Sequence, residues 1–188
     1  MSDGPRLPYA EAYARAQRLV DDLAPHVVRC KVAGSLRRKR PDVGDIEIVV
    51  EPRMREGMFI SVPDVDAIRA VASRWGLVSS KEKPDGSEKM LKVRLYEPAD
   101  FKVELYIVTP PAEWACILAI RTGPAKLGEW AMTRMKQRGY RHTCGHVETA
   151  DGARVDVPDE EAFFRLAGLR CVAPSLRDTD AAMRPVAV

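Results

Sequence analysis

The chain has few cysteines, and their placement excludes two common scaffolds. Its four cysteines lie far apart and form no Cys-x-x-Cys pair. A disulfide-rich domain or a zinc knuckle requires more closely spaced pairs. We therefore expect four reduced thiols without a functional role.

Long apolar runs are also absent. No stretch approaches the ~18 to 20 apolar residues that cross a bilayer. The opening Met1-Ser2-Asp3-Gly4-Pro5 lacks the charged-then-apolar layout of a secretion signal. A length of 188 residues with 46% hydrophobic residues is nevertheless enough for a substantial core. These features predict a monomeric globule in the cytoplasm, or in the host cytoplasm if the chain is phage-encoded, with no membrane partner.

The net charge of +3 is too mild to indicate a partner, but the basic residues are unevenly distributed. The segment from Arg121 to Arg141 contains six basic residues and one acid. The basic residues are Arg121, Lys126, Arg134, Lys136, Arg138 and Arg141. Much of this segment has the pattern of an amphipathic helix. Its polar face could bind DNA in a salt-dependent way or could simply be solvated.

Two carboxylates one residue apart occur in a stretch that is typical of a strand, Asp45 to Val50. Side chains two apart in a strand leave the same face, with Cα atoms roughly 6 to 7 Å apart. Asp45 and Glu47 could therefore bind one divalent cation or a close pair. Glu104 lies on another alternating strand, from Phe101 to Val108. Together the three predict a Mg²⁺ or Mn²⁺ site, although alternating acids on a strand are often only solvated.

The turn at Gly34-Ser35 offers groups that suit a phosphate. Without a side chain, Gly34 lets the backbone approach phosphate oxygens, and the Ser35 hydroxyl can donate to them. Arg38 adds a permanent positive charge beside the turn. Carboxylates that bind two metal ions next to a phosphate site are typical of phosphoryl transfer.

The remaining patterns predict an α+β fold. We expect helices over residues 9–23, from a cap at Asp64 or Asp66 to Gly76, and after a cap at Asp159. Residues 90–95 and 101–108 predict a hairpin through a Pro98 turn, after a polar turn region from Ser79 to Glu88. Helical patterns follow Pro110-Pro111, which is the best internal boundary, and we expect a frayed tail after Asp178.

Several of these motifs occur in an order and spacing that resembles the DNA polymerase beta-like nucleotidyltransferases, specifically the family X DNA polymerases and their short phage-type relatives. The resemblance covers most of residues 8–178. The matching pieces are the helix before Val32, Gly34-Ser35-Leu36-Arg37-Arg38, Gly44-Asp45-Ile46-Glu47, Lys102-Val103-Glu104-Leu105, Arg121-Thr122-Gly123, and Glu160-Glu161-Ala162-Phe163-Phe164-Arg165-Leu166-Ala167-Gly168-Leu169 with Pro174.

This resemblance implies a palm over residues 1–110, with a mixed sheet and helices on one face, and a small α/β thumb lobe over residues 111–188. It implies that Asp45, Glu47 and Glu104 are catalytic and bind two Mg²⁺ ions. The implied nucleotide-binding residues are Gly34, Ser35, Arg38, Thr122 and Gly123. The implied DNA-binding residues are Lys102, which would lie near the primer terminus, and Arg121, Lys126, Lys136 and Arg138.

The chain departs from the family pattern at the site itself. The family usually has Asp at the positions of Glu47 and Glu104, and aromatic residues where this chain has Ile120-Arg121. Family members can have a cis peptide after the Thr-Gly glycine, and a proline there lowers the cost of cis from about 3 kcal/mol to below about 1. We therefore predict that Gly123-Pro124 is cis.

The implied function is nucleotide addition to a DNA 3′-hydroxyl with release of pyrophosphate, in gap filling or repair, from a nucleoside triphosphate and a primer-template or gapped DNA. Two alternatives remain open. The acceptor could be an RNA end, a protein or a small hydroxyl compound, because the palm chemistry does not depend on what bears the hydroxyl. The chain could also be a DNA-binding module whose active site has decayed.

Overall fold

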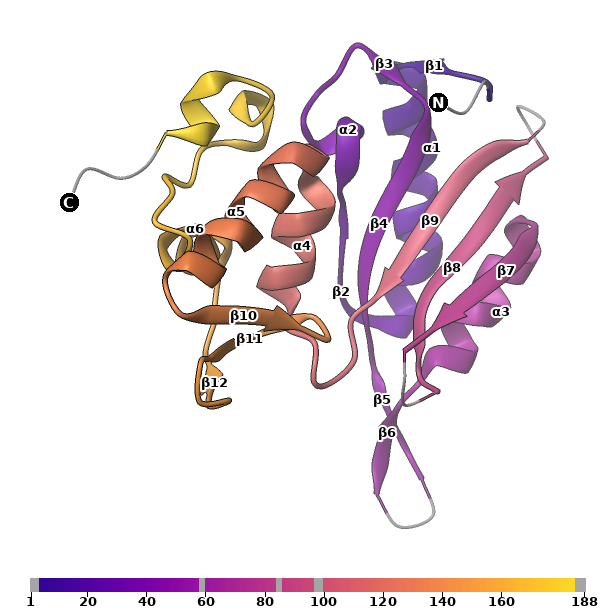
Figure 1. Cartoon of the computed structure of the whole chain (residues 1–188). Coiled ribbons are helices and arrows are strands. Elements are labelled where there is room, and N and C mark those ends of the chain that lie inside the picture. The colour runs from indigo at the N-terminus through magenta and orange to yellow at the C-terminus, as the bar shows by residue number, and fades with distance from the viewer. Residues whose placement is uncertain (1–3, 58–59, 84–85, 97–99, 185–188) are drawn as a thin grey trace.

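The computed structural model describes residues 4–57, 60–83, 86–96 and 100–184, and it shows an α+β fold (Figure 1). The α-helices are α1 (Tyr9–Leu23), α2 (Gly34–Arg37), α3 (Val65–Trp75), α4 (Trp114–Thr122), α5 (Ala125–Gln137) and α6 (Glu160–Leu166). The strands are β1 (Leu7–Pro8), β2 (Val27–Val32), β3 (Asp42–Val43), β4 (Asp45–Pro52), β5 (Met54–Glu56), β6 (Ser61–Pro63), β7 (Leu77–Glu82), β8 (Glu88–Leu95), β9 (Phe101–Ile107), β10 (Tyr140–Thr143), β11 (His146–Thr149) and β12 (Arg154–Val155). Short 3₁₀ turns are η1 (Ala24–His26), η2 (Pro174–Leu176) and η3 (Asp180–Met183).

The main sheet is mixed, with the strand order β2-β4-β9-β8-β7. Strands β4 and β9 pair in parallel, and the other neighbours pair antiparallel. The β8–β9 hairpin confirms the predicted pairing, while Pro98 lies outside the described residues. The polar turn expected from Ser79 is wrong in its first part, because Ser79 to Glu82 belong to β7. Pairing with β8 gives this polar stretch its extended conformation.

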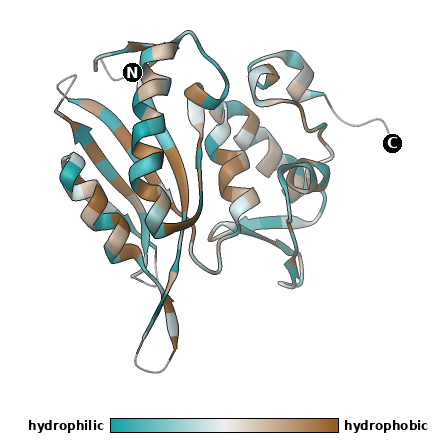
Figure 2. Cartoon of the chain, turned by 180° about the vertical axis from the view of Figure 1, so that it is seen from behind, coloured by the Kyte–Doolittle hydropathy of each residue, from teal (hydrophilic) through white to brown (hydrophobic). Residues whose placement is uncertain are grey.

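Helices α1 and α3 cover one face of this sheet (Figure 2). The apolar side chains of β4 and β9 that alternate with the carboxylates pack against the two helices. Of the two predicted caps, Asp64 begins α3, with its Oδ1 accepting a hydrogen bond from the Ala67 amide. Gly76 ends this helix in the left-handed region, at φ 103°. The face opposite the carboxylates is therefore the main core.

The expectation of helices on one face only is incomplete, because α4 covers part of the other face. Leu118 of α4 packs with Val49, Tyr106 and Val108 from the sheet. This contact follows from the sequence of β9, which is buried on both faces beyond Glu104. The carboxylates of β4 and β9 lie on this same face of the sheet.

The C-terminal part has its own apolar core, built from α4, α5, α6 and the β10-β11-β12 sheet. Asp159 caps α6 as predicted, with Oδ1 accepting a hydrogen bond from the Ala162 amide at 2.7 Å. The expected fraying after Asp178 is wrong up to residue 184, because η3 follows and buries Ala182 in this core. All four cysteines are free thiols, as expected. None of the helices in the described ranges is long and apolar enough to cross a membrane.

A buried group of charges connects α2 to the C-terminal part. Both Glu160 oxygens accept hydrogen bonds from Arg37, at 2.9 and 2.5 Å, and Oε1 also accepts one from Arg177 at 2.8 Å. The Arg177 side chain is 1% exposed and that of Glu160 is 16% exposed. Burial alone would raise the Glu160 pKa, but hydrogen bonding and charge from Arg37 and Arg177 lower it overall. This carboxylate therefore compensates two guanidinium groups.

We predict that Glu160→Gln lowers the free energy of unfolding by about 3 kcal/mol, because it leaves buried guanidinium charge uncompensated. A lowered folded-state pKa stabilises the fold above the unfolded value, and the stabilisation is lost as pH falls through the folded value. Urea unfolding at neutral pH and below pH 4 should therefore show a difference between wild type and variant that shrinks in acid. Glu161→Gln, at the exposed neighbouring carboxylate, is the control and should change stability by less than about 0.5 kcal/mol. Equal effects of the two substitutions would contradict the role of Glu160.

Candidate functional site

The parallel pairing of β4 and β9 brings the three predicted carboxylates together. Asp45 lies opposite Lys102 in the register, and Glu47 lies opposite Glu104. Since side chains alternate along each strand, these four side chains leave the same face of the sheet. The same-face grouping expected for Asp45 and Glu47 is confirmed, and Glu104 joins it from the neighbouring strand.

Two neighbours contact this carboxylate cluster directly. The Lys102 ammonium lies 3.0 Å from Asp45 Oδ2 and 3.4 Å from Glu104 Oε1. The Tyr106 hydroxyl donates a hydrogen bond to Glu104 Oε2. The Arg121 guanidinium carbon lies 4.1 Å from the centre of the Tyr106 ring. Both oxygens of Glu104 are therefore oriented by side chains of its own strand.

The electrostatics of the cluster are those of crowded like charges. Burial, together with the charges of Asp45 and Glu104, raises the pKa of Glu47 to about 7. Burial would also raise the Glu104 pKa, but the bonds from Tyr106 and Lys102 lower it overall. The Lys102 pKa is raised, since Asp45 and Glu104 outweigh its burial. The cluster therefore favours a cation beside it.

The three carboxylates suit Mg²⁺ or Mn²⁺ by their chemistry, since both ions prefer hard oxygen ligands. Within the described ranges, no three His, Cys, Asp or Glu side chains form a group that could hold a metal ion as they stand. Lys102 instead lies between Asp45 and Glu104. A divalent cation shared by these carboxylates would compete with the ammonium group for the same oxygens.

Gly34 begins α2 directly against the cluster. Its φ is +60°, and a Cβ at this position would meet Glu47 Oε2 at 2.0 Å. The Glu47 carboxylate lies where a side chain at Gly34 would need space, and the approach of a phosphate to this backbone stays a prediction. Two independent constraints, the left-handed backbone and the close carboxylate, therefore require glycine here.

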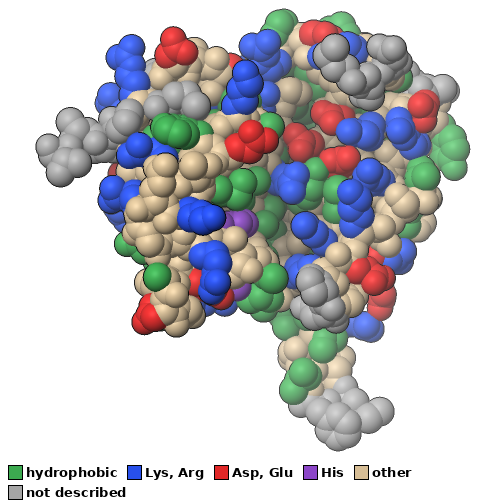
Figure 3. Space-filling model, viewed as in Figure 1, with side chains coloured by type: hydrophobic (Ala, Val, Ile, Leu, Met, Phe, Trp, Pro, Cys, Tyr) green, Lys and Arg blue, Asp and Glu red, His purple; other side chains and the backbone are tan. Residues whose placement is uncertain are grey.

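Ser35 and Arg38 line a cleft of about 410 Å³ together with Asp45, Glu47 and Gly123. The Ser35 hydroxyl is buried and finds no hydrogen-bond partner in the part of the chain that the structure describes. Arg38 donates to the Thr122 carbonyl oxygen at 2.5 Å and to Asp178 Oδ2 at 3.0 Å. Figure 3 shows acidic side chains near the centre of this face with Lys and Arg side chains around them. An unpaired hydroxyl and a guanidinium beside carboxylates are suited to a phosphate group that binds with metal ions.

The predicted Thr-Gly turn is only partly in the cleft. Gly123 lines it, and the Gly123-Pro124 peptide is cis, which confirms that prediction. Thr122 is fully buried, and its hydroxyl contacts Arg37 instead of the cleft. Arg37 thus fills the space behind the turn.

The predicted DNA-binding residues divide into three groups. Lys102 and Arg121 belong to the cluster described above. Lys126 and Lys136 are exposed on α5. Arg138 follows this helix and donates to the Leu166 carbonyl oxygen at 3.1 Å. The structure therefore brings Arg121 to the carboxylates and leaves the two lysines on the outer surface.

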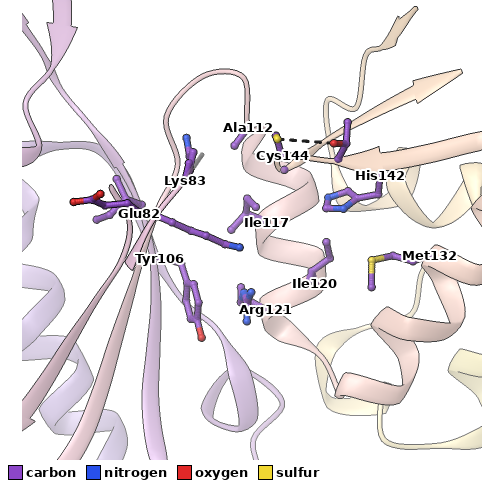
Figure 4. A pocket seen from close by; sticks show the side chains of 14 residues that line it. Glu82, Lys83, Tyr106, Ala112, Ile117, Ile120, Arg121, Met132, His142 and Cys144 are labelled. Carbon is purple, nitrogen blue, oxygen red and sulfur yellow. Dashed lines mark hydrogen bonds between the residues drawn. The ribbon is translucent and has the colours of Figure 1, made fainter. Parts of the chain in front are cut away.

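A second cavity of about 440 Å³ adjoins the cleft, and Ile120, Arg121 and Met132 line both. Figure 4 shows Tyr106 from the sheet beside Arg121 from α4, with His142 of β10 across the cavity. The sequence did not single out Tyr106. Its position two residues after Glu104 on the same strand face was the available signal.

No protein-family model matches the chain, and no curated protein sequence matches it.

We predict that Gly34→Ala is more destabilising than Gly152→Ala. Both glycines have positive φ, which costs an alanine roughly 1–2 kcal/mol, but only at Gly34 would the new Cβ also meet a side chain. Thermal unfolding of both variants separates the steric cost from the backbone cost, because nothing lies within 4 Å of a Cβ at Gly152. Equal shifts in melting temperature would show that Glu47 moves away freely.

We also predict that the metal-free protein loses stability as the pH rises from about 4.5 to about 7. A carboxyl whose pKa is raised from 4.5 to about 7 keeps its proton in the folded state where the unfolded state has lost it. Rising pH therefore disfavours the fold, by on the order of 3 kcal/mol for this shift. Glu47→Gln should flatten the pH dependence of urea unfolding in EDTA. Glu56→Gln, at an exposed carboxylate, should leave it as steep as in wild type.

Proposed function

We propose that the chain is a nucleotidyltransferase that adds a nucleotide to the 3′-hydroxyl of a DNA acceptor and releases pyrophosphate. The observation that supports this most is the meeting of Asp45, Glu47 and Glu104 on paired strands next to Ser35 and Arg38. A carboxylate cluster for divalent cations and a phosphate-binding turn are the two parts that phosphoryl transfer needs.

Each residue has a distinct role in this proposal. Asp45, Glu47 and Glu104 would hold two Mg²⁺ or Mn²⁺ ions, which would lower the pKa of the acceptor hydroxyl and offset charge on the leaving pyrophosphate. Ser35 would donate its unpaired hydroxyl to the triphosphate, and Arg38 would add positive charge. The hydroxyl oxygen forms a bond to the α-phosphorus while the bond to pyrophosphate breaks. Its proton leaves to a carboxylate of the cluster or to water.

The surroundings of Glu104 support its place near the reacting hydroxyl. Tyr106 fixes Oε2, so that Oε1 faces Lys102 and Asp45. A carboxylate held from one side is pre-oriented, and less rotational freedom is lost when a cation or a hydroxyl binds to the other side. Lys102, from the same face, would lie beside the acceptor end once it is released from the carboxylates.

The experiment is primer extension on gapped, recessed and single-stranded DNA, with each dNTP and rNTP in turn. We expect divalent-cation-dependent addition by wild type and a loss of about 100-fold or more in Asp45→Asn, which weakens a metal ligand directly. Asp66→Asn changes an exposed carboxylate on α3 and should retain activity. Full activity of Asp45→Asn would overturn the assignment.

The same experiment separates the alternatives. Release of pyrophosphate from the triphosphate without extension of DNA would indicate another acceptor. Triphosphate binding can be measured by thermal shift in the presence of Mg²⁺ or Mn²⁺. If no cation-dependent binding is found, the chain is better explained as a DNA-binding module whose active site has decayed.

A further inference from the structure

The proposed reaction does not use a groove that lies on the other side of α2 from the cleft. It has a volume of about 490 Å³ and runs between α1 and the edge strand β2. Val20, Cys30, Val32 and Leu36 give it an apolar lining. Figure 2 shows α1 in front of the sheet on this side of the molecule.

Aromatic rings form one side of this α1–β2 groove. Tyr9 and Tyr13 are stacked, with ring centroids 5.8 Å apart and planes at 21°. Tyr9 packs against the main core, whereas Tyr13 is 48% exposed. The outer ring of the pair therefore has a solvent-exposed surface, held in place by the half-buried ring of Tyr9 behind it. A pre-oriented aromatic surface is suited to a planar group, because little freedom is lost on stacking.

The charged residues that line the groove are all basic. They are Lys31, Arg37 and Lys39, and no carboxylate of the described residues lines the groove. Arg37 is neutralised by Glu160, while both lysines are exposed and have no ion pair among the described residues. Lys31 lies on the edge strand β2, where its side chain leaves the face opposite Cys30 and Val32, and Lys39 follows α2. The groove therefore offers uncompensated positive charge to an anion.

The groove and the candidate active site share the short helix α2. Ser35 and Arg38 line the cleft, whereas Leu36 and Lys39 line the groove. A chain molecule that occupied both would pass around α2. A ligand that is planar and apolar in part, anionic in part and long enough for this path is a single-stranded nucleic acid.

We propose that the α1–β2 groove binds an unpaired segment of the nucleic acid acceptor, with a base stacked on Tyr13 and a phosphate beside Lys39. This deepens the proposed function, because it makes the acceptor a polynucleotide with a single-stranded part. Binding at this groove requires no metal ion, since the carboxylate cluster does not line it. It can therefore be measured apart from catalysis.

The test is fluorescence anisotropy of a labelled 12-nucleotide oligothymidylate in EDTA and low salt. Tyr13→Ala should weaken binding about fivefold or more, as expected for loss of one base–aromatic stack, while Tyr13→Phe should bind like wild type. Lys39→Ala should weaken binding and reduce its salt dependence. The matched controls are Tyr96→Ala and Lys81→Ala, which remove an exposed tyrosine and an exposed lysine outside the groove.

An abasic oligonucleotide of the same length isolates the stacking. It should bind more weakly than oligothymidylate to wild type, and the two should bind equally to Tyr13→Ala. Retained affinity in both Tyr13→Ala and Lys39→Ala would overturn the proposal. Failure of wild type to bind the oligonucleotide would also overturn it, and would point to another ligand of the groove, such as a peptide strand.

Oligonucleotide binding and nucleotide addition, measured separately, distinguish this proposal from the proposed function, and Asp45→Asn tests binding without the catalytic carboxylate. If that variant and wild type bind the oligonucleotide through Tyr13 but wild type adds no nucleotide, the groove is supported and the catalytic proposal fails. If wild type extends DNA and the Tyr13 and Lys39 variants bind the oligonucleotide like wild type, the proposal for the groove is wrong and the catalytic proposal stands.

Discussion

The site depends on one constraint, the parallel register between β4 and β9. This register sets Glu47 opposite Glu104, so two carboxylates from distant parts of the sequence lie on neighbouring strands. Like charges placed opposite each other in a sheet destabilise it. The arrangement persists because both strands are fixed by apolar packing, against α1 and α3 on one face and partly against α4 on the other. Hydrophobic burial thus supports an electrostatically unfavourable cluster.

The neighbouring cations reduce this cost but do not remove it. Lys102 contacts Asp45 and Glu104, and Arg121 and Arg38 lower the Glu47 pKa, yet that pKa is still raised. A carboxylate that carries a proton near neutral pH is not fully compensated by its surroundings. A divalent cation would supply the missing charge, and this residual imbalance is typical of functional sites rather than of structural ion pairs.

Local patterns predicted much of the fold and part of the site. The alternation of residues along a strand placed Asp45 and Glu47 on one face, and cap chemistry located the starts of α3 and α6 at Asp64 and Asp159. Contacts between distant segments were not predictable in this way. The approach of Glu47 to Gly34 and the stacking of Arg121 on Tyr106 depend on how α2 and α4 dock on the sheet. Nothing local encodes that docking.

Helix α2 links these features because it is too short to fix its own position. Four residues form a single turn, which is unstable unless its neighbours hold it. Gly34 contacts Glu47, Arg37 is bound by Glu160, and Arg38 is bound by the Thr122 carbonyl and Asp178. The last three partners all lie in the C-terminal part of the chain. The position of the candidate phosphate-binding residues therefore depends on the packing between the two parts, so substitutions at this contact would alter both stability and the geometry of the cleft.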